Sequence, residues 1–175
     1  EGIKVVVFCA TEDNADVVFV SLKKARFQVV RHSSSDEGDQ NWNDFLTNPF
    51  IQTIVCGPSA EEGINLQGGK KTLIHFDLPV QPNRIEQRIG RVDRYGAGDS
   101  VQSFVMVDKG SALQNSWFNL LDQGLGVFHQ SISSLQYLVE AEMLVLQKEL
   151  VHAGVEALDF LRDRLSGPTG LVASE

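Results

Sequence analysis

Short apolar runs alternate with segments of helical periodicity along most of the chain. Runs rich in β-branched residues predict five buried strands, at Lys4–Cys9, Phe27–Arg31, Ile51–Cys56, Thr72–Asp77 and Val101–Val107. Helical segments are expected at 12–25, where Thr11 is the N-cap, at 41–46 and at 81–96. Strands and helices that alternate in this way connect by right-handed crossovers. The order predicts an α/β fold with a parallel sheet covered on both faces.

The pattern becomes helical from Ser111 to about Leu165. Gly124 and Gly126 are expected to interrupt the first helical stretch. An apolar stripe follows at 135–155, which we interpret as a packing face rather than a membrane surface. We therefore expect a lobe at 1–109, a helical extension packed on it at 110–165, and a flexible tail at 166–175.

The composition is that of a globular protein, with 42% hydrophobic and 22% charged residues among 175. No apolar run approaches the ~20 residues that span a bilayer. No signal peptide opens the chain, and a strand begins almost directly after Glu1, so we expect part of a longer protein. Cys9 and Cys56 lack metal-ligand spacing and are interpreted as buried free thiols.

A net charge of −8 argues at first against a nucleic-acid ligand. The acidity is uneven, however. Residues 1–109 carry 12 Lys+Arg against 15 Asp+Glu, a balance of −3, whereas residues 110–175 carry 3 against 8, a balance of −5. The charge therefore leaves nucleic-acid binding by the first part of the chain open.

The segment 81–96, QPNRIEQRIGRVDRYG, is predicted as one helix that begins near Pro82 and ends before Gly96. At about 100° per residue, the apolar positions fall on one side, namely Ile85, Ile89 and Val92. The opposite side carries Arg84, Gln87, Arg91 and Arg94, with Arg88 beside them. Arginine forks suit phosphate oxygens because they bind in a planar, bidentate way. A solvated surface helix is the alternative.

Gly90 lies in the middle of this predicted helix, on the border of the arginine side. Glycine at such a position costs about 1 kcal/mol relative to alanine. We therefore expect Gly90 to permit the close approach of another backbone or of a ligand.

The string QRIGRVDR resembles motif VI of superfamily 2 helicases and translocases. The longer segment EEGINLQGGKKTLIHFDLPVQPNRIEQRIGRVDRYG resembles motifs V and VI of the Swi/Snf-type branch, and within it the bacterial RapA/HepA-like ATPases. The resemblance covers residues 3–107. It implies the second RecA-like lobe of a P-loop NTPase-type motor, which acts on ATP with Mg²⁺.

The resemblance also implies roles for individual residues. Gly63 and Asn65 match motif V and would lie near the nucleotide. Four residues match motif VI: Gln87, Arg88, Arg91 and Arg94. In the family, the last two arginines face the γ-phosphate, which makes Arg91 and Arg94 candidate arginine fingers, with Gln87 beside them and Arg88 as a nucleotide ligand.

The resemblance places a nucleic-acid contact at Arg31, His32 and Ser33, which follow the second strand. A plain polar turn is the alternative for this loop. After the third strand, the family usually has Ser or Thr where this chain has Gly57 and Pro58. Proline lacks an N–H group, so Ser59 is the candidate substitute as a nucleic-acid ligand.

No G-x-x-x-x-G-K-[ST] loop exists in the sequence, and no Asp-Glu pair ends a strand. Gly68-Gly69-Lys70-Lys71-Thr72 has the wrong spacing and precedes a strand. The sequence thus predicts half of an ATPase site and no metal ligands of its own.

The partners implied are an N-terminal RecA-like lobe, which would bind most of the ATP and Mg²⁺, double-stranded DNA, and RNA polymerase or another DNA-bound protein, in the cytoplasm at the nucleoid. The alternative is a non-catalytic RecA-like module that binds a protein partner. A dinucleotide-dependent oxidoreductase is excluded because no G-x-G-x-x-G follows the first strand.

Overall fold

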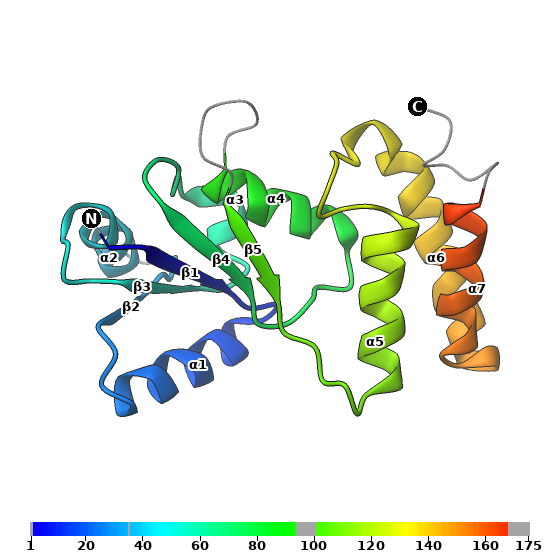
Figure 1. Cartoon of the computed structure of the whole chain (residues 1–175), viewed down its shortest axis with the longest axis horizontal. Helices are drawn as coiled ribbons and strands as arrows, with labels where there is room; N and C mark the ends of the chain where they lie inside the picture. Colours follow the sequence, from blue (N-terminus) through cyan, green and yellow to red (C-terminus); the bar gives the residue numbers. More distant parts are fainter. Residues whose placement is uncertain (1, 35, 94–100, 168–175) are drawn as a thin grey trace. The chain divides into compact units, whose positions relative to one another are not determined.

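A computed structural model describes residues 2–34, 36–93 and 101–167. Its central element is a five-stranded, all-parallel sheet with the strand order β2-β3-β1-β4-β5 (Figure 1). The strands are β1 (Lys4–Phe8), β2 (Val29–Arg31), β3 (Thr53–Cys56), β4 (Lys71–His75) and β5 (Gln102–Val105). The predicted α/β fold with a parallel sheet is confirmed.

The central strand β1 lies between β3 and β4, with Val6 opposite both Ile54 and Leu73. All three residues are completely buried. Because the strands are parallel, their carboxyl ends meet at one edge of the sheet, where ligands bind in open α/β sheets. The loops that follow β1, β2, β3 and β4 all begin at this edge.

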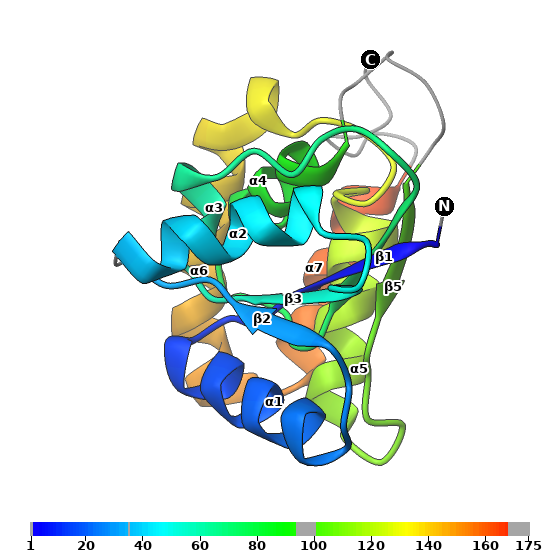
Figure 2. The same ribbon diagram turned by 90° about the vertical axis from the view of Figure 1, so that its left-hand side faces the viewer.

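Helix α1 (Glu12–Lys24) covers one face of the sheet (Figure 2). Thr11 is its N-cap, since the Thr11 hydroxyl accepts a hydrogen bond from the Asn14 backbone N–H at 3.1 Å, as predicted. Ala15 and Val18 of α1 pack against Val7 and Val55 of the sheet.

Three helices cover the other face: α2 (Asp36–Thr47), α3 (Ala60–Gly63) and α4 (Pro82–Val92). Phe45 of α2, Ile64 beside α3 and Val92 of α4 join Phe8 and Leu73 in this core.

Two segments differ from the predictions. Helix α2 begins at Asp36 rather than at residue 41, so the predicted start of this helix is wrong. Acidic residues are favourable in the first turn of a helix, a signal that the serine and glycine content obscured. The segment after β3 contains one helical turn, α3. This turn was not predicted from the sequence because four residues are too few to show a helical period.

Helix α4 confirms the predicted helix from Pro82 and its apolar side, but it ends at Val92 rather than just before Gly96, a residue that lies outside the described ones. Ile85 and Val92 are buried, and Ile89 packs against the core. No described backbone approaches Gly90, because a Cβ added there would meet no atom within 4 Å, and the approach of a ligand stays a prediction.

The described residues form two compact units, 1–80 with 87–106 and 81–86 with 107–175. The expected boundary at residue 109 stays a prediction, as does the packing of the extension on the lobe. Residues 168–175 of the expected tail lie outside the described residues. Among the helices that the structure describes, none combines the length and apolar character that crossing a membrane requires.

The second unit contains α5 (Ala112–Asn119), a π-helical turn (Leu120–Gly124), a 3₁₀ turn (Ser133–Leu135), α6 (Gln136–Ala153) and α7 (Glu156–Ser166). Gly124 ends the π-helical turn, and Gly154, with φ of 60°, separates α6 from α7. Within the predicted stripe, Val139 and Leu146 are buried whereas Leu138 is exposed.

Glu86, in the first half of α4, joins this helix to the start of the 3₁₀ turn. Its carboxylate accepts hydrogen bonds from the Ser133 hydroxyl at 2.8 Å, from the Ile132 backbone N–H at 3.3 Å and from the Ser131 hydroxyl. All of these residues belong to the second unit.

The π-helical turn and α7 approach each other closely at Gly124. A Cβ there would lie 3.0 Å from Cδ1 of Leu120 and 3.3 Å from Cα of Arg162. We predict that Gly124→Ala destabilises the second unit by about 1–3 kcal/mol, as overpacking does in well-packed cores. Chemical denaturation measures this change. Gly90→Ala is the control, because its Cβ meets open space and should be neutral or stabilising by up to ~1 kcal/mol.

Candidate functional site

Arg88 and Glu61 form a buried ion pair beneath the carboxyl edge of the sheet. Arg88 Nε donates to Glu61 Oε1 at 2.8 Å, and the side chains are 0% and 4% exposed. Arg88 Nη1 also donates to the Asp77 carbonyl oxygen at 2.9 Å, and the guanidinium lies over the ring of Phe8. Arg88 thus joins α4 to α3 and to the residue that follows β4.

The expectation that Arg88 stands on the exposed arginine side of α4 is therefore wrong. The guanidinium has its fork directed into the core, where a nucleotide has no access. An arginine is the residue type most suited to this position, since it keeps its charge and its planar set of donors when buried. Periodicity alone did not place it, because Arg88 lies at the border between the two sides of the helix.

Arg91 lies one turn further along α4 and is only partly buried. Its Nε donates to the Glu61 carbonyl oxygen at 2.7 Å, and Nη1 lies 3.5 Å from the Ile64 carbonyl oxygen. These two acceptors fix the direction of the guanidinium along the loop that follows α3. Arg91 is therefore an oriented group rather than a mobile surface side chain.

The same loop contacts the backbone of α4. The Leu66 N–H donates to the Arg91 carbonyl oxygen at 2.8 Å, and Gln67 Nε2 donates to the Gly90 carbonyl oxygen at 3.0 Å. Gly63 and Asn65 precede these contacts along the loop and are exposed, and no atom lies within 4 Å of a Cβ built at Gly63. The loop and the helix therefore form one surface that is open beside Arg91.

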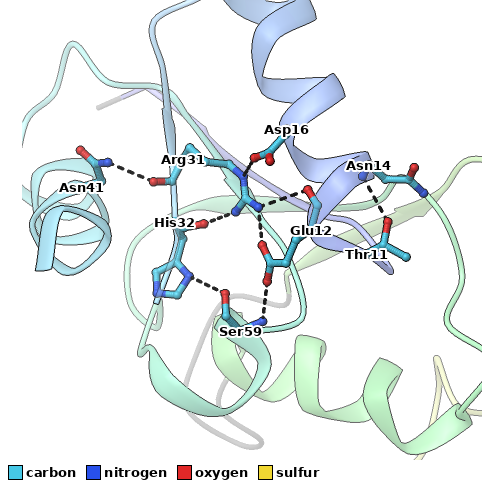
Figure 3. A network of polar contacts seen from close by, with 8 residues as sticks. All are labelled: Thr11, Glu12, Asn14, Asp16, Arg31, His32, Asn41 and Ser59. Carbon is cyan, nitrogen blue, oxygen red and sulfur yellow. Dashed lines mark hydrogen bonds and ion pairs between the residues drawn. The ribbon is translucent and has the colours of Figure 1, made fainter. Parts of the chain in front are cut away.

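A second polar network joins the ends of β1, β2 and β3 (Figure 3). Arg31, at the end of β2, donates through Nη2 to the Glu12 carboxylate and through Nε to Asp16 Oδ1 at 3.1 Å. Its Nη1 donates to the His32 carbonyl oxygen. The Arg31 side chain is only 10% exposed, so its guanidinium is already occupied by groups of this chain.

The other predicted nucleic-acid residues lie around this network. His32 is buried, with Nδ1 3.5 Å from the Ser59 hydroxyl. Ser59 donates its backbone N–H to Glu12 Oε1 at 3.0 Å. Ser33 lies next along the chain and is partly buried. The structure brings Arg31, His32 and Ser59 together, although they come from the end of β2, the residue after it and the loop after β3.

Glu12 is the residue that sequence reasoning missed as part of the site. In the sequence it is only the first residue of a predicted helix, where an acidic side chain is common. Burial alone would raise the pKa of its carboxyl group, but hydrogen bonds from the Ser59 backbone and the Arg31 guanidinium outweigh burial and hold the pKa below the usual 4.5. A Cβ at Gly57 would lie 2.3 Å from Glu12 Oε2, so the carboxylate keeps its described position only while residue 57 lacks a side chain.

Two other chemically active side chains lie inside the sheet. Burial lowers the pKa of His75 to about 3, helped by the charge of Arg88, and Nε2 lies 3.2 Å from the Ser103 hydroxyl. Burial raises the pKa of Cys9 to about 12, and it also raises the pKa of Cys56. Both thiols are buried and free, as predicted, and are unreactive at neutral pH.

Similarity to known proteins shows the family of this chain. The model of the "Helicase conserved C-terminal domain" matches residues 1–96, which is more than half of the chain. The chain belongs to this family. Its relatives include the RNA polymerase-associated protein RapA of Vibrio atlanticus, 34% identical over 110 residues, and the uncharacterised ATP-dependent helicase YqhH of Bacillus subtilis, 33% identical over 98 residues.

The aligned part covers 62% of this chain and 11% of that RapA protein, and 56% of this chain and 17% of YqhH. The chain thus spans a small fraction of these relatives. Among solved structures, the C-terminal part of the Fun30 ATPase domain aligns with a TM-score of 0.58 at 20% identity, over 81% of this chain and 48% of that one. The C-terminal domain of the DEAD-box protein Dbp5 aligns with a TM-score of 0.55 at 20% identity. This alignment covers 81% of this chain and 84% of the Dbp5 domain.

Membership identifies the sheet with its helices as a helicase C-terminal lobe, and the resemblance to superfamily 2 is confirmed. Gln87 lies on α4 and is partly buried. Arg94, the second expected finger, lies outside the described residues. In the described part of the lobe, no group of three or more His, Cys, Asp or Glu side chains is arranged to hold a metal ion.

The buried ion pair generates one prediction about the lobe. Replacing Arg88 by Met leaves Glu61 charged and buried without its main partner, and should destabilise the lobe by about 3–5 kcal/mol. The double variant Arg88→Met with Glu61→Leu should recover most of the loss, because the uncompensated charge is gone. Urea denaturation of the three proteins measures both effects. A single variant as stable as the parent would contradict a structural role.

The neutral state of His75 generates another prediction. The folded pKa of about 3 lies below the ordinary value of 6.5, so the contribution of His75 to stability is fully present above about pH 6.5 and declines as the pH falls toward 3. His75→Gln should flatten the decline in urea midpoint between about pH 7 and pH 4.5. The exposed His152 provides the matched control variant, His152→Gln. Imidazole resonances of His75 that titrate near pH 6 would contradict this expectation.

Proposed function

We propose that this chain is the C-terminal motor lobe of an ATP-dependent DNA translocase, in which Arg91 and Arg94 complete an ATP site on an N-terminal RecA-like lobe. Three observations support this proposal. The chain belongs to the helicase C-terminal family and spans only 11% of a RapA relative. Its sequence holds motif V and VI residues without a phosphate loop. The observation that carries the proposal is the position of Arg91, fixed by the carbonyl groups of Glu61 and Ile64.

In this proposal, bound ATP with Mg²⁺, held mainly by the other lobe, supplies the phosphoryl group that is transferred to water. The contribution of this lobe is positive charge and positioning. Arg91 presents a guanidinium whose direction is set before any ligand arrives, which is the property that makes a fixed charge effective in a transition state. Gly63 and Asn65 lie on the open surface beside it, where the absence of side-chain bulk at Gly63 leaves room for the nucleotide.

Arg88 has a different part in this site. Because its guanidinium is buried against Glu61, it does not serve as a nucleotide ligand in the conformation described. Instead it holds α4 against α3, and Glu61 at the same time offers its backbone carbonyl to Arg91. Glu61 therefore links the buried Arg88 to Arg91, the proposed arginine finger.

The nucleic-acid contact is proposed at the network of Arg31, His32, Ser33 and Ser59, with double-stranded DNA as the ligand. This network lies at the carboxyl edge of the sheet, at the ends of β2 and β3. RNA polymerase is the proposed protein partner of the whole protein, because one relative is named as associated with it. ATP hydrolysis would alternate the closed and open arrangements of the two lobes and so drive movement along DNA.

The proposal predicts a large loss of turnover in a polypeptide that carries both lobes when Arg91 is replaced by Lys. Lysine keeps the charge but loses the planar fork. Loss of an arginine finger typically costs ~10³–10⁵ in turnover, or roughly 4–7 kcal/mol of barrier. Nucleotide affinity should fall much less. Steady-state hydrolysis with DNA present, nucleotide binding and thermal melts measure these quantities, and Arg94→Lys should behave in the same way.

Arg84→Lys is the matched control, since Arg84 lies on the same helix but outside the motif. It should hydrolyse ATP within a few-fold of the parent. Folded Arg91 and Arg94 variants with the turnover of the parent would show that these arginines take no part in hydrolysis, and would favour the non-catalytic interaction module instead.

A further inference from the structure

The Glu12 carboxylate has the surroundings of a bound anion. It accepts the Ser59 backbone N–H at 3.0 Å and the Arg31 guanidinium, so its donors come from the loops after β3 and β2. Backbone N–H groups and guanidinium forks are the donors that proteins use for phosphate oxygens. The carboxylate also lies against Gly57, where a Cβ would come within 2.3 Å of Glu12 Oε2 in the described position of that side chain.

This arrangement is more specific than a surface ion pair requires. Exposed ion pairs contribute little stability and need no fixed surroundings. Here the cation is 10% exposed, a backbone N–H is aimed at the carboxylate, and a glycine makes room for it. Arg31 is held in addition by Asp16 through Nε at 3.1 Å, so the guanidinium keeps its orientation if Glu12 moves away.

We infer that Glu12 occupies an anion site whose external ligand is a backbone phosphate of DNA, and that the carboxylate competes with this phosphate. The inference rests on the proposed nucleic-acid contact and adds its regulation. Glu12 is 44% exposed, so its side chain can rotate into solvent without moving α1. A phosphodiester then takes the Ser59 N–H and the Arg31 guanidinium, and one negative charge replaces another.

The competition has a functional consequence. A lobe whose phosphate site is filled by its own carboxylate binds DNA weakly and releases it readily. Such weak, exchangeable contacts suit a protein that moves along its track. Removal of the Glu12 charge should convert the weak contact into a tight one.

The experiment compares Glu12→Gln with Asp13→Asn in the 175-residue chain. Both variants remove one negative charge from the first turn of α1, and Asp13 is exposed. Binding of a labelled DNA duplex is measured by fluorescence anisotropy at several salt concentrations. Glu12→Gln should bind about tenfold more tightly, and the slope of log K against log salt should steepen by ~0.9, the value for one phosphate. Asp13→Asn should change affinity less than about twofold.

An equal increase in DNA affinity in both variants would overturn the inference, because it would reflect only the change in net charge. A parent that binds DNA while Glu12→Gln binds no tighter would also overturn it, and would leave the proposed DNA contact standing. Arg31→Lys in the Glu12→Gln background should abolish the gain, and a gain that survives this change would place the phosphate elsewhere.

A second measurement separates the anion site from the proposed function. The backbone amide resonance of Ser59 is followed while inorganic phosphate is added to the parent and to Glu12→Gln. A saturable shift in the variant at lower phosphate concentration than in the parent supports the self-occupied site even if neither protein binds DNA, an outcome that would refute the DNA contact alone. The absence of any Ser59 shift in both proteins overturns the inference.

Discussion

The structure of the lobe depends on one buried charge pair. Arg88 and Glu61 are both nearly inaccessible to solvent, and charges in such a place are stable only when they are paired and hydrogen-bonded. The pair fixes the distance between α3 and α4, and the Asp77 carbonyl oxygen adds the end of β4. The geometry of the loop from Glu61 to Gln67 follows from this anchor, and Arg91 takes its direction from that loop. The buried pair is therefore the foundation of the proposed catalytic position.

Two arginines three residues apart thus have different physical roles. Arg88 points into the core and Arg91 points along the loop, because a step of three residues on a helix turns the side chain by about 60° from full register. The role of Arg31 likewise depends on the groups around its guanidinium. Arg31 lies at the sheet edge with carboxylates on two sides, so its accessible charge is set by what Glu12 and Asp16 leave unneutralised.

The sequence sufficed to predict the sheet, the N-cap Thr11 and the apolar side of α4, since these depend on local periodicity and capping. It did not suffice for α3 or for the start of α2, because one turn has no period and an acidic run fits either a loop or a first turn. The burial of Arg88 depends on Glu61, 27 positions away, and Glu12 meets Ser59 across 47 positions. Contacts at such separations are set by the packing of the sheet and leave no local signal.

The division of the chain has a consequence for how the protein can be cut. The second unit takes residues 81–86 from the first half of α4 and resumes at 107, so the backbone passes between the units three times. No single break in the chain gives either unit whole. A chain shortened at residue 109 keeps Glu86 but loses the Ser131 and Ser133 hydroxyl groups that its carboxylate binds. Producing either unit whole therefore requires a backbone whose segments are joined in a new order.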